Sequence, residues 1–243
     1  MPEGPTIIIA KEAIRLFKGR KVVGVAGKTK IDQDRLLNKS ITGVKSWGKH
    51  LLICFKGFTV RIHFLMFGSY RINDRKNTKP MLRLVFSDGE INFYAGNIKL
   101  LEGNVNDWYD WSRDVMSKHW DAKQAVNSLR KEKTVMICDA LLDQELFSGV
   151  GNIIKTEVLY RSRVHPESIV GKIPLAKARE IVKEAVLYAF EFLEWKKAGV
   201  LRKHWLAYAK KTCKRCDLPM IKKYTGEGQR RSFFCANCQQ RYH

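Results

Sequence analysis

Four cysteines near the C-terminal end of the chain limit its possible folds more than any other feature. They form two Cys-x2-Cys pairs separated by 18 residues, and they are Cys213, Cys216, Cys235 and Cys238. Four thiolates at this spacing are typical of a tetrahedral structural zinc site, whereas catalytic zinc keeps an open position and a redox dithiol needs only one pair. The sequence therefore predicts one structural Zn2+ ion.

The residues between the two pairs predict a β-hairpin. Residues 222–224 and 226–234 alternate enough for two strands, and the turn between them is rich in glycine and basic. Such a tip can enter a DNA groove. The alternative is that the hairpin only stabilises this end of the chain and that its arginines are solvated.

The composition favours a polyanionic partner. Lys and Arg number 45 against 24 Asp and Glu, which gives a formal net charge of +21, and such an excess suits nucleic acid or an anionic membrane surface. No run approaches the roughly 20 apolar residues of a membrane span, and no signal segment precedes the fold. We therefore expect a soluble intracellular protein, in the cytoplasm, nucleoid or nucleus, with no membrane partner. Cys54 and Cys138 lie among apolar residues, as reduced core cysteines do.

Hydrophobic periodicity predicts one helix followed by a β-rich lobe. Residues 5–18 place apolar side chains at helical spacing before Gly19. Five short β-rich runs follow, and Ser87-Asp88-Gly89-Glu90 between the last two fits a hairpin turn. Short strands at such close spacing indicate an antiparallel sandwich or a barrel-like lobe. The expected strands are residues 22–25, 50–55, 59–64, 81–86 and 91–94.

The strand pattern fades after a polar stretch at residues 108–120, which we expect to connect two parts of the chain. Residues 122–160 have a helical pattern with an interruption at 148–151, and residues 175–197 place apolar side chains along one helix face. The second part is therefore predicted to be mainly α-helical.

The first residues carry a potential reactive group. If Met1 is removed, which the small Pro2 permits, the chain begins with a secondary amine beside the Glu3 carboxylate. An α-amino group has a pKa of about 8, so part of it is unprotonated at neutral pH and can attack an aldehyde carbon, while a carboxylate can transfer protons. The alternative is structural, because Pro and Glu also suit the first turn of a helix.

Other segments are ambiguous when taken singly. Gly149-Val150-Gly151-Asn152 precedes a helical pattern and either binds a phosphate at a helix N-terminus or is a simple helix junction. Lys49, His63 and Met66 lie at the ends of predicted strands, where they are either functional or ordinary surface and core residues.

Taken together, the motifs occur in a recognisable order. The chain begins with Pro-Glu-Gly-Pro, continues with Trp-Gly-Lys, His-x2-Met-x-Gly-Ser, Leu-Leu-Asp-Gln and Gly-Val-Gly-Asn-Ile, and ends with the four-cysteine hairpin. This order resembles that of the formamidopyrimidine-DNA glycosylase and endonuclease VIII family of base-excision repair enzymes, over essentially the whole chain. A chance match of several spaced motifs is far rarer than a match of any one.

The resemblance implies an α+β fold of two lobes. An N-terminal helix and an antiparallel β-sandwich are followed by a helical helix-two-turn-helix domain with a C-terminal zinc-finger hairpin. We expect the catalytic lobe over residues 1–115, the helix-two-turn-helix domain over residues 116–208 and the zinc finger over residues 209–243. The expected partner is damaged double-stranded DNA, and the expected state is a monomer.

The resemblance also implies roles for individual residues. Pro2 is the implied nucleophile that attacks C1′ of the damaged nucleotide, and Glu3 is the implied acid and base. Base loss gives a Schiff base at Pro2, and β- and δ-elimination then nick the strand without a catalytic metal. The other matched residues are Lys49 near the scissile phosphate, His63 and Asn152 as phosphate contacts, Arg230 as the finger arginine, and Met66 as the side chain that intercalates where the lesion is flipped out.

Two departures from the family pattern bear on the substrate and the mechanism. Thr6 stands where the family often has a second glutamate, which affects the proton-transfer arrangement. Residues 94–98, Tyr-Ala-Gly-Asn-Ile, stand where the purine-directed branch carries a segment of the Asp-Pro-Arg-Arg-Phe-Gly type with two further wedge residues. The missing segment, together with Pro-Glu-Gly-Pro at the start of the chain, points to the endonuclease VIII branch and to oxidised pyrimidines.

Two rival functions remain open at this point. One is a non-catalytic damaged-DNA-binding protein on the same scaffold, which a retained Met1 would favour because the proline nitrogen would then be an amide. A more distant one is a zinc-ribbon protein that binds RNA, which the basic charge would also suit.

Overall fold

A computed structural model describes residues 2–243, so Met1 and the question of its removal lie outside the described residues. The chain divides into two compact units, which we call the first unit, ending at Asp110, and the second unit, beginning at Trp111. The predicted domain boundaries at residues 115 and 208 stay predictions.

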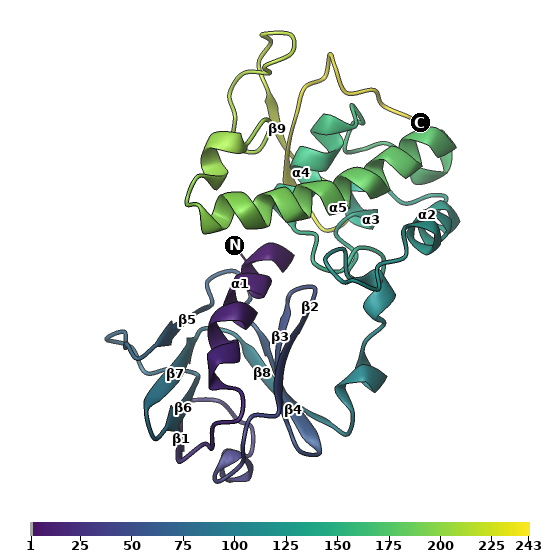
Figure 1. The fold of residues 1–243 in the computed structure, drawn as a ribbon. Helices are drawn as coiled ribbons and strands as arrows, with labels where there is room; N and C mark the ends of the chain where they lie inside the picture. The colour runs from purple at the N-terminus through teal and green to yellow at the C-terminus, as the bar shows by residue number, and fades with distance from the viewer. Residues whose placement is uncertain (1) are drawn as a thin grey trace. The chain divides into compact units, whose positions relative to one another are not determined.

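The first unit combines a helix at its start with antiparallel sheets (Figure 1). Its helices and strands are α1 (Gly4–Ile14), η1 (Arg15–Phe17), β1 (Gly24–Ala26), η2 (Asp34–Leu36), β2 (Gly43–Trp47), β3 (His50–Phe55), β4 (Phe58–His63), β5 (Ser69–Ile72), β6 (Leu82–Phe86), β7 (Gly89–Tyr94), β8 (Asn97–Glu102) and η3 (Val105–Trp108). The strands form two four-stranded sheets, ordered β1-β6-β7-β5 and β2-β3-β4-β8.

One hydrophobic core joins both sheets to α1. Along β4, Val60 and Ile62 are buried at the period of two that a pleated strand imposes. Along α1, Ile7, Ala10 and Ile14 are buried at helical spacing, and the helix packs against β2 and β3. The start of the chain is therefore held against one of the two sheets.

The second unit is mainly helical and ends in a two-stranded hairpin (Figure 1). Its helices and strands are η4 (Trp111–Arg113), α2 (Ala122–Lys131), α3 (Ile137–Ala140), α4 (Asn152–Arg161), η5 (Val170–Lys172), α5 (Leu175–Lys197), η6 (Leu201–His204), β9 (Ile221–Thr225) and β10 (Arg230–Phe234). The core of this unit gathers apolar side chains from α2, α3, α4 and α5.

The predicted fold class is confirmed, and most elements lie where the periodicity placed them. The predicted helix at 175–197 is α5, and the predicted strand at 50–55 is β3. The hairpin turn is also confirmed, because Phe86 pairs with Gly89 across Ser87 and Asp88.

Three strands of the first unit, β2, β5 and β8, were not predicted. In β2 the apolar residues Val44 and Trp47 are three positions apart, which breaks the alternation that marks a strand. Strand β5 does alternate, but over only four residues. Strand β8 does alternate over its first four residues, but only Ala95 and Gly96 separate it from the strand predicted at residues 91–94.

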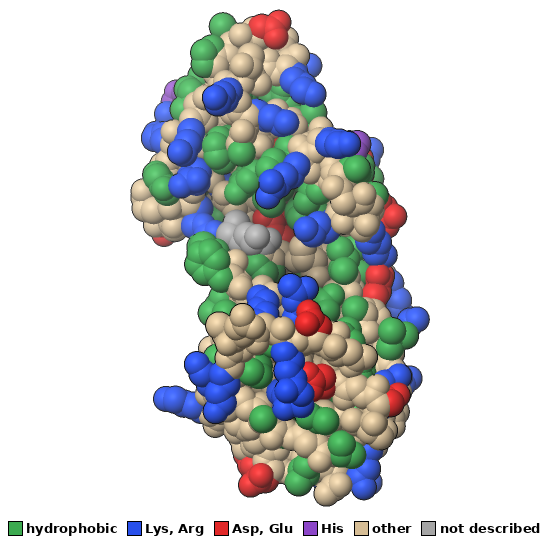
Figure 2. All heavy atoms as spheres, turned by 90° about the vertical axis from the view of Figure 1, so that its left-hand side faces the viewer, with side chains coloured by type: hydrophobic (Ala, Val, Ile, Leu, Met, Phe, Trp, Pro, Cys, Tyr) green, Lys and Arg blue, Asp and Glu red, His purple; other side chains and the backbone are tan. Residues whose placement is uncertain are grey.

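Basic side chains are spread over the surface of both units. Figure 2 shows one face of the molecule, on which Lys and Arg side chains are widely distributed and Asp and Glu side chains are fewer. This distribution agrees with the formal net charge of +21. In the described part of the chain, no helix is both long enough and apolar enough to cross a membrane.

Candidate active site and metal centre

Glu3 and its neighbours form the start of α1. Glu3 is the N-cap residue, its side chain is fully buried, and its backbone N–H donates to Thr6 Oγ1 over 2.9 Å. The Thr6 hydroxyl donates in turn to the Glu3 carbonyl oxygen over 2.7 Å. Thr6, the first departure from the family pattern, thus serves as a capping residue. The cap fixes the backbone that carries Pro2 and the Glu3 carboxylate.

Lys49 lies in the two-residue turn between β2 and β3. Gly48, the first residue of the turn, has a φ of +50°, a left-handed conformation that type II′ hairpins require and glycine adopts easily. Trp47 pairs directly with His50 across the turn, and its indole N–H donates to the Asp110 carbonyl oxygen over 2.9 Å. Because α1 packs against β2 and β3, the predicted nucleophile and Lys49 belong to the same packed structure.

Two histidines lie at strand ends near this turn, one at the start of β3 and one at the end of β4. His50 and His63 are cross-strand partners whose ring centroids lie 5.3 Å apart, edge to face. Burial, followed by the charge of Arg61, lowers the pKa of His50 to about 4. Burial, followed by the charge of Lys49, also lowers the pKa of His63. Both imidazoles are therefore neutral at pH 7, and a phosphate nearby would meet a cationic Lys49 and a neutral donor at His63.

We expect His50 to make the free energy of unfolding depend on pH in the acid range. Its pKa in the unfolded chain is about 6.5, so between this pH and the folded-state pKa of about 4 the unfolded chain binds a proton that the folded protein excludes. This contribution to stability is fully present above about pH 6.5 and falls by about 3 kcal/mol as the pH decreases to about 4. Urea unfolding at about pH 7 and about pH 4.5 measures it.

The comparison uses His50→Gln, which cannot titrate in this range. The stability difference between wild type and His50→Gln should become smaller as the pH falls. His119→Gln, which removes an exposed histidine from the second unit, is the matched control and should leave the pH dependence unchanged. Parallel pH curves for wild type and His50→Gln would contradict the expectation.

Met66 lies in a tight turn that presents three adjacent apolar side chains to solvent. The Gly68 N–H donates to the Phe64 carbonyl oxygen over 2.7 Å and closes the turn. A Cβ at Gly68 would overlap backbone oxygen atoms on both sides, so only glycine fits. Leu65, Met66 and Phe67 are 53%, 52% and 83% exposed, which is unusual for large apolar side chains. Met66 was a candidate residue from the sequence, whereas the more exposed Phe67 was not.

Asn152 begins α4 directly after the predicted glycine turn. The Gln144 side-chain amide donates to two carbonyl oxygens across this turn, over 2.7 and 3.1 Å, and its Oε1 accepts from the Gly149 N–H over 3.1 Å. Asn152 is only 4% exposed, and its Oδ1 is buried without a hydrogen bond from the described residues. The turn thus depends on Gln144, and only a small part of Asn152 is accessible to a phosphate.

Arg230 is exposed at the start of β10, beside the glycine-rich turn of the hairpin. The Asp139 carboxylate, from α3, accepts hydrogen bonds from the backbone N–H groups of Glu227 and Gly228 over 3.0 and 3.4 Å. Gly226 has a φ of +73°, and a Cβ there would overlap the same carboxylate. The tip that carries Arg230 is therefore fixed to the helical part of the second unit.

Two fully buried charged residues of α4 also connect distant segments. The Lys155 ammonium donates to Ser232 Oγ over 2.9 Å and to the Arg231 carbonyl oxygen over 3.3 Å. The Glu157 carboxylate accepts from the backbone N–H groups of residues 206–208 over distances between 2.7 and 3.1 Å. Burial raises the pKa of Glu157, and these hydrogen bonds oppose the rise. The hairpin and the segment before it are both anchored on α4.

The four predicted metal ligands come together. The sulfur atoms of Cys213, Cys216, Cys235 and Cys238 all lie within 4.8 Å of one another, and three of these separations are 3.4, 3.4 and 3.7 Å. A tetrahedral site with Zn–S bonds near 2.3 Å places its sulfur atoms about 3.8 Å apart, whereas a disulfide needs about 2.05 Å. The four thiolates therefore fit one structural Zn2+ ion, which would hold the two ends of the hairpin together.

The residues that hold the candidate site in place were not predicted from the sequence. Lys155 and Glu157 carry a detectable signal, because charged residues in the middle of an otherwise apolar stretch indicate buried pairing. Gln144 belongs to the Leu-Leu-Asp-Gln motif, but its hydrogen bonds across the turn before α4 form only in the folded chain. Asp139 has no local signal, since it meets the hairpin across 88 positions of sequence.

Two family models match the chain. The model of the formamidopyrimidine-DNA glycosylase N-terminal domain matches residues 1–97, and the model of the formamidopyrimidine-DNA glycosylase H2TH domain matches residues 112–201. The chain belongs to the formamidopyrimidine-DNA glycosylase and endonuclease VIII family. The family predicted from the order of the motifs is confirmed, and each match falls within one of the two units.

Curated relatives place the chain on the endonuclease VIII-like branch. Endonuclease 8-like 3 of Xenopus laevis is 32% identical over 224 residues, which cover 86% of this chain and 36% of that protein. Endonuclease 8-like 2 of Homo sapiens is 32% identical over 196 residues, which cover 75% of this chain and 58% of that protein. The chain thus spans only part of the length of these relatives.

Solved structures share the fold. Lactococcus lactis formamidopyrimidine-DNA glycosylase, non-covalently bound to DNA that contains an AP site, aligns with a TM-score of 0.87 at 22% identity, over 98% of this chain and 100% of that chain. The same enzyme with DNA that contains an oxidised pyrimidine aligns with a TM-score of 0.87 at 21% identity, over 99% and 100% of the two chains. At this identity, the likeness supports the fold.

Proposed function

We propose that the protein is a bifunctional DNA glycosylase and AP lyase that removes oxidised bases, mainly pyrimidines, from damaged duplex DNA. One observation carries the proposal: Glu3 is fully buried at the N-cap of α1, directly beside Pro2. Removing a carboxylate from water is unfavourable, and a helix start is satisfied equally well by an exposed polar cap. In a family of glycosylases, a buried carboxylate beside a potential N-terminal amine supports an acid–base role.

The proposed reaction begins at the N-terminal amine. With Met1 removed, the Pro2 nitrogen attacks C1′ of the damaged nucleotide, the glycosidic C1′–N bond breaks, and the leaving base takes up a proton supplied through Glu3. The sugar ring opens to give a positively charged iminium between Pro2 and C1′. Loss of a C2′ proton then breaks the C3′–O bond, and a second elimination breaks the C5′–O bond. Water hydrolyses the iminium and restores the amine.

The proposed DNA contacts come from both units. In the first unit, Lys49 supplies a cation near the scissile phosphate, neutral His63 donates a hydrogen bond, and the exposed Met66 fills the space that a flipped nucleotide leaves. In the second unit, Arg230 contacts a phosphate from the hairpin tip, and the turn before Asn152 offers backbone donors at the start of a helix. The structural Zn2+ holds the hairpin in the form that presents Arg230.

Oxidised pyrimidines are the proposed substrates because a wedge segment is missing. Only Ala95 and Gly96 connect β7 with β8, where the purine-directed branch carries its longer segment. We expect nicking of duplexes that contain thymine glycol, 5-hydroxyuracil or dihydrouracil to be roughly tenfold faster, or more, than nicking of a duplex with 8-oxoguanine. A time course on end-labelled duplexes, with and without borohydride, measures cleavage and the covalent adduct together.

The lesion panel also separates the proposal from its rivals. If the duplex with 8-oxoguanine were nicked fastest, the activity would be directed at purines. Tight binding of every lesion duplex without any nick or adduct would indicate a non-catalytic damaged-DNA-binding protein. Stronger binding to structured RNA than to lesion duplex would contradict a role in DNA repair.

A further inference from the structure

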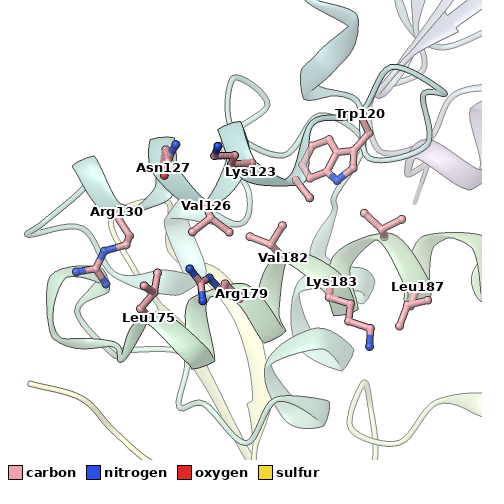
Figure 3. A pocket seen from close by; sticks show the side chains of 12 residues that line it. Trp120, Lys123, Val126, Asn127, Arg130, Leu175, Arg179, Val182, Lys183 and Leu187 are labelled. Carbon is pink, nitrogen blue, oxygen red and sulfur yellow. The ribbon is translucent and has the colours of Figure 1, made fainter.

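We infer that a groove between α2 and α5 is a docking site for an acidic amphipathic helix of a partner protein. The groove has a volume of about 660 Å3, and none of its residues belongs to the proposed DNA contacts. Figure 3 shows side chains of α2 and α5 facing one another across it, with Trp120 at one end. The residues that line it are Trp120, Ala122, Lys123, Val126, Asn127, Arg130, Leu175, Arg179, Val182, Lys183, Val186 and Leu187.

The floor of the groove is aliphatic and follows helical spacing. Val126 of α2 and Val182 of α5 are buried at its base. Leu175 and Leu187, at its two ends on α5, are 40% and 43% exposed. The distance along α5 between these leucines is about 18 Å, which matches about twelve residues of a helix laid alongside. A groove of this form accepts a helix whose apolar residues recur every three or four positions.

The rim of the groove is cationic and uncompensated. Lys123, Arg130, Arg179 and Lys183 surround the aliphatic floor, and within the described residues none of the four forms an ion pair.

Three carboxylates of α5 pair with cations outside the groove. Glu180 pairs with Lys177 over 2.7 Å, while Glu184 and Glu191 pair with Arg161 over 3.5 and 2.7 Å. Four unpaired cations around an apolar floor complement a segment with acidic flanks and an apolar face.

The lining favours a peptide over a single-stranded nucleic acid. Proteins that bind single strands without base readout use a series of aromatic side chains on which successive bases stack. Trp120 is the one aromatic residue among those that line the groove, and it lies at one end. The rest of the apolar lining consists of Ala, Val and Leu, which suit leucine-like anchors of a helix.

The probe for the test is a fluorescein-labelled peptide of about 14 residues, with Leu at positions i, i+4, i+7 and i+11 and Glu at the flanking positions. Added to the full chain, it should bind with a Kd of about 10 μM, measured by fluorescence anisotropy. A scrambled peptide of the same composition should bind roughly tenfold more weakly, because it keeps the charge and loses the apolar face.

Variants locate the binding. Arg179→Glu with Lys183→Glu should weaken the amphipathic peptide roughly tenfold or more. Lys196→Glu with Lys203→Glu makes the same charge change at exposed positions outside the groove and should have little effect. Leu175→Ser with Leu187→Ser should also weaken binding, and neither exposed leucine is needed for the core. All three double variants should nick lesion duplex at the wild-type rate.

Several results would overturn the inference. Equal binding of the amphipathic and scrambled peptides would show that the peptide binds only by non-specific charge attraction. Equal effects of the groove and control variants would show the same. If oligo(dT) displaced the peptide and lost affinity in the groove variants, the groove would be a nucleic-acid surface. Loss of lesion cleavage in the groove variants, with peptide binding intact, would also place the groove in the DNA-binding surface.

Discussion

Protein whose N-terminal amine has been acetylated will form no covalent adduct with lesion-containing DNA in the presence of borohydride, whereas protein with a free Pro2 amine will. An amide nitrogen is not nucleophilic, so no iminium forms and borohydride has nothing to reduce. We expect the adduct yield to fall by roughly a hundredfold or more. Denaturing gels and intact-mass analysis measure the adduct and also show whether Met1 has been removed.

Two variants near the amine sharpen this test. Pro5→Ala changes a second proline in the same helix start and leaves the amine free, so it should keep the adduct. Glu3→Gln should slow base removal by roughly 10²- to 10⁴-fold, since the carboxylate that moves the proton is gone. An undiminished adduct after acetylation would place the nucleophile on another residue. Retained Met1, together with tight lesion binding and no adduct, would favour the non-catalytic alternative.

Candidate chemical residues could be named from the sequence alone, whereas the contacts that hold them in place could not. Pro2 and Glu3 stand at the start of the chain, and the cysteine pairs have a fixed spacing, so both are visible without a fold. Glu3 illustrates the limit: the sequence offered a helix cap and a catalytic acid as alternatives, and the structure shows it at the N-cap with its carboxylate fully buried. The position of Glu3 as a helix cap is therefore compatible with its proposed role as the acid and base.

Residues whose roles depend on distant contacts could not be predicted. The pKa of His50 is lowered to about 4 mainly because its side chain is buried in the folded protein. The hydroxyl of Tyr109 lies 3.2 Å from His50 Nδ1, and Tyr109 comes from a distant part of the sequence. Asp139 acts on the hairpin turn only because α3 is folded beside it. In each case the neighbouring residues in the sequence give no indication of the role, because the role depends on tertiary contacts.

Removal of zinc will weaken binding to lesion DNA by roughly tenfold or more and will leave the Pro2 amine reactive. Cys213 and Cys235 pack in one cluster with Tyr160 of α4, so the metal would join the two ends of the hairpin to the helical core. Without the metal, nothing joins the four sulfur atoms that lie within 4.8 Å of one another, and the hairpin that carries Arg230 separates from α4. Chelator treatment or Cys235→Ser, followed by fluorescence anisotropy with lesion duplex, measures the loss.

The buried ammonium of Lys155 makes this effect larger than the loss of one arginine contact. Two of its partners, Ser232 Oγ and the Arg231 carbonyl oxygen, belong to the hairpin, so a loosened hairpin deprives a buried charge of these two hydrogen bonds. Hydrogen exchange should therefore increase in α4 as well as in β9 and β10. Cys54→Ser removes a thiol outside the cluster and should keep one zinc per chain. The adduct at saturating DNA should persist without zinc, because Pro2 lies in the first unit. If chelation left lesion affinity unchanged, the hairpin would have only a structural role.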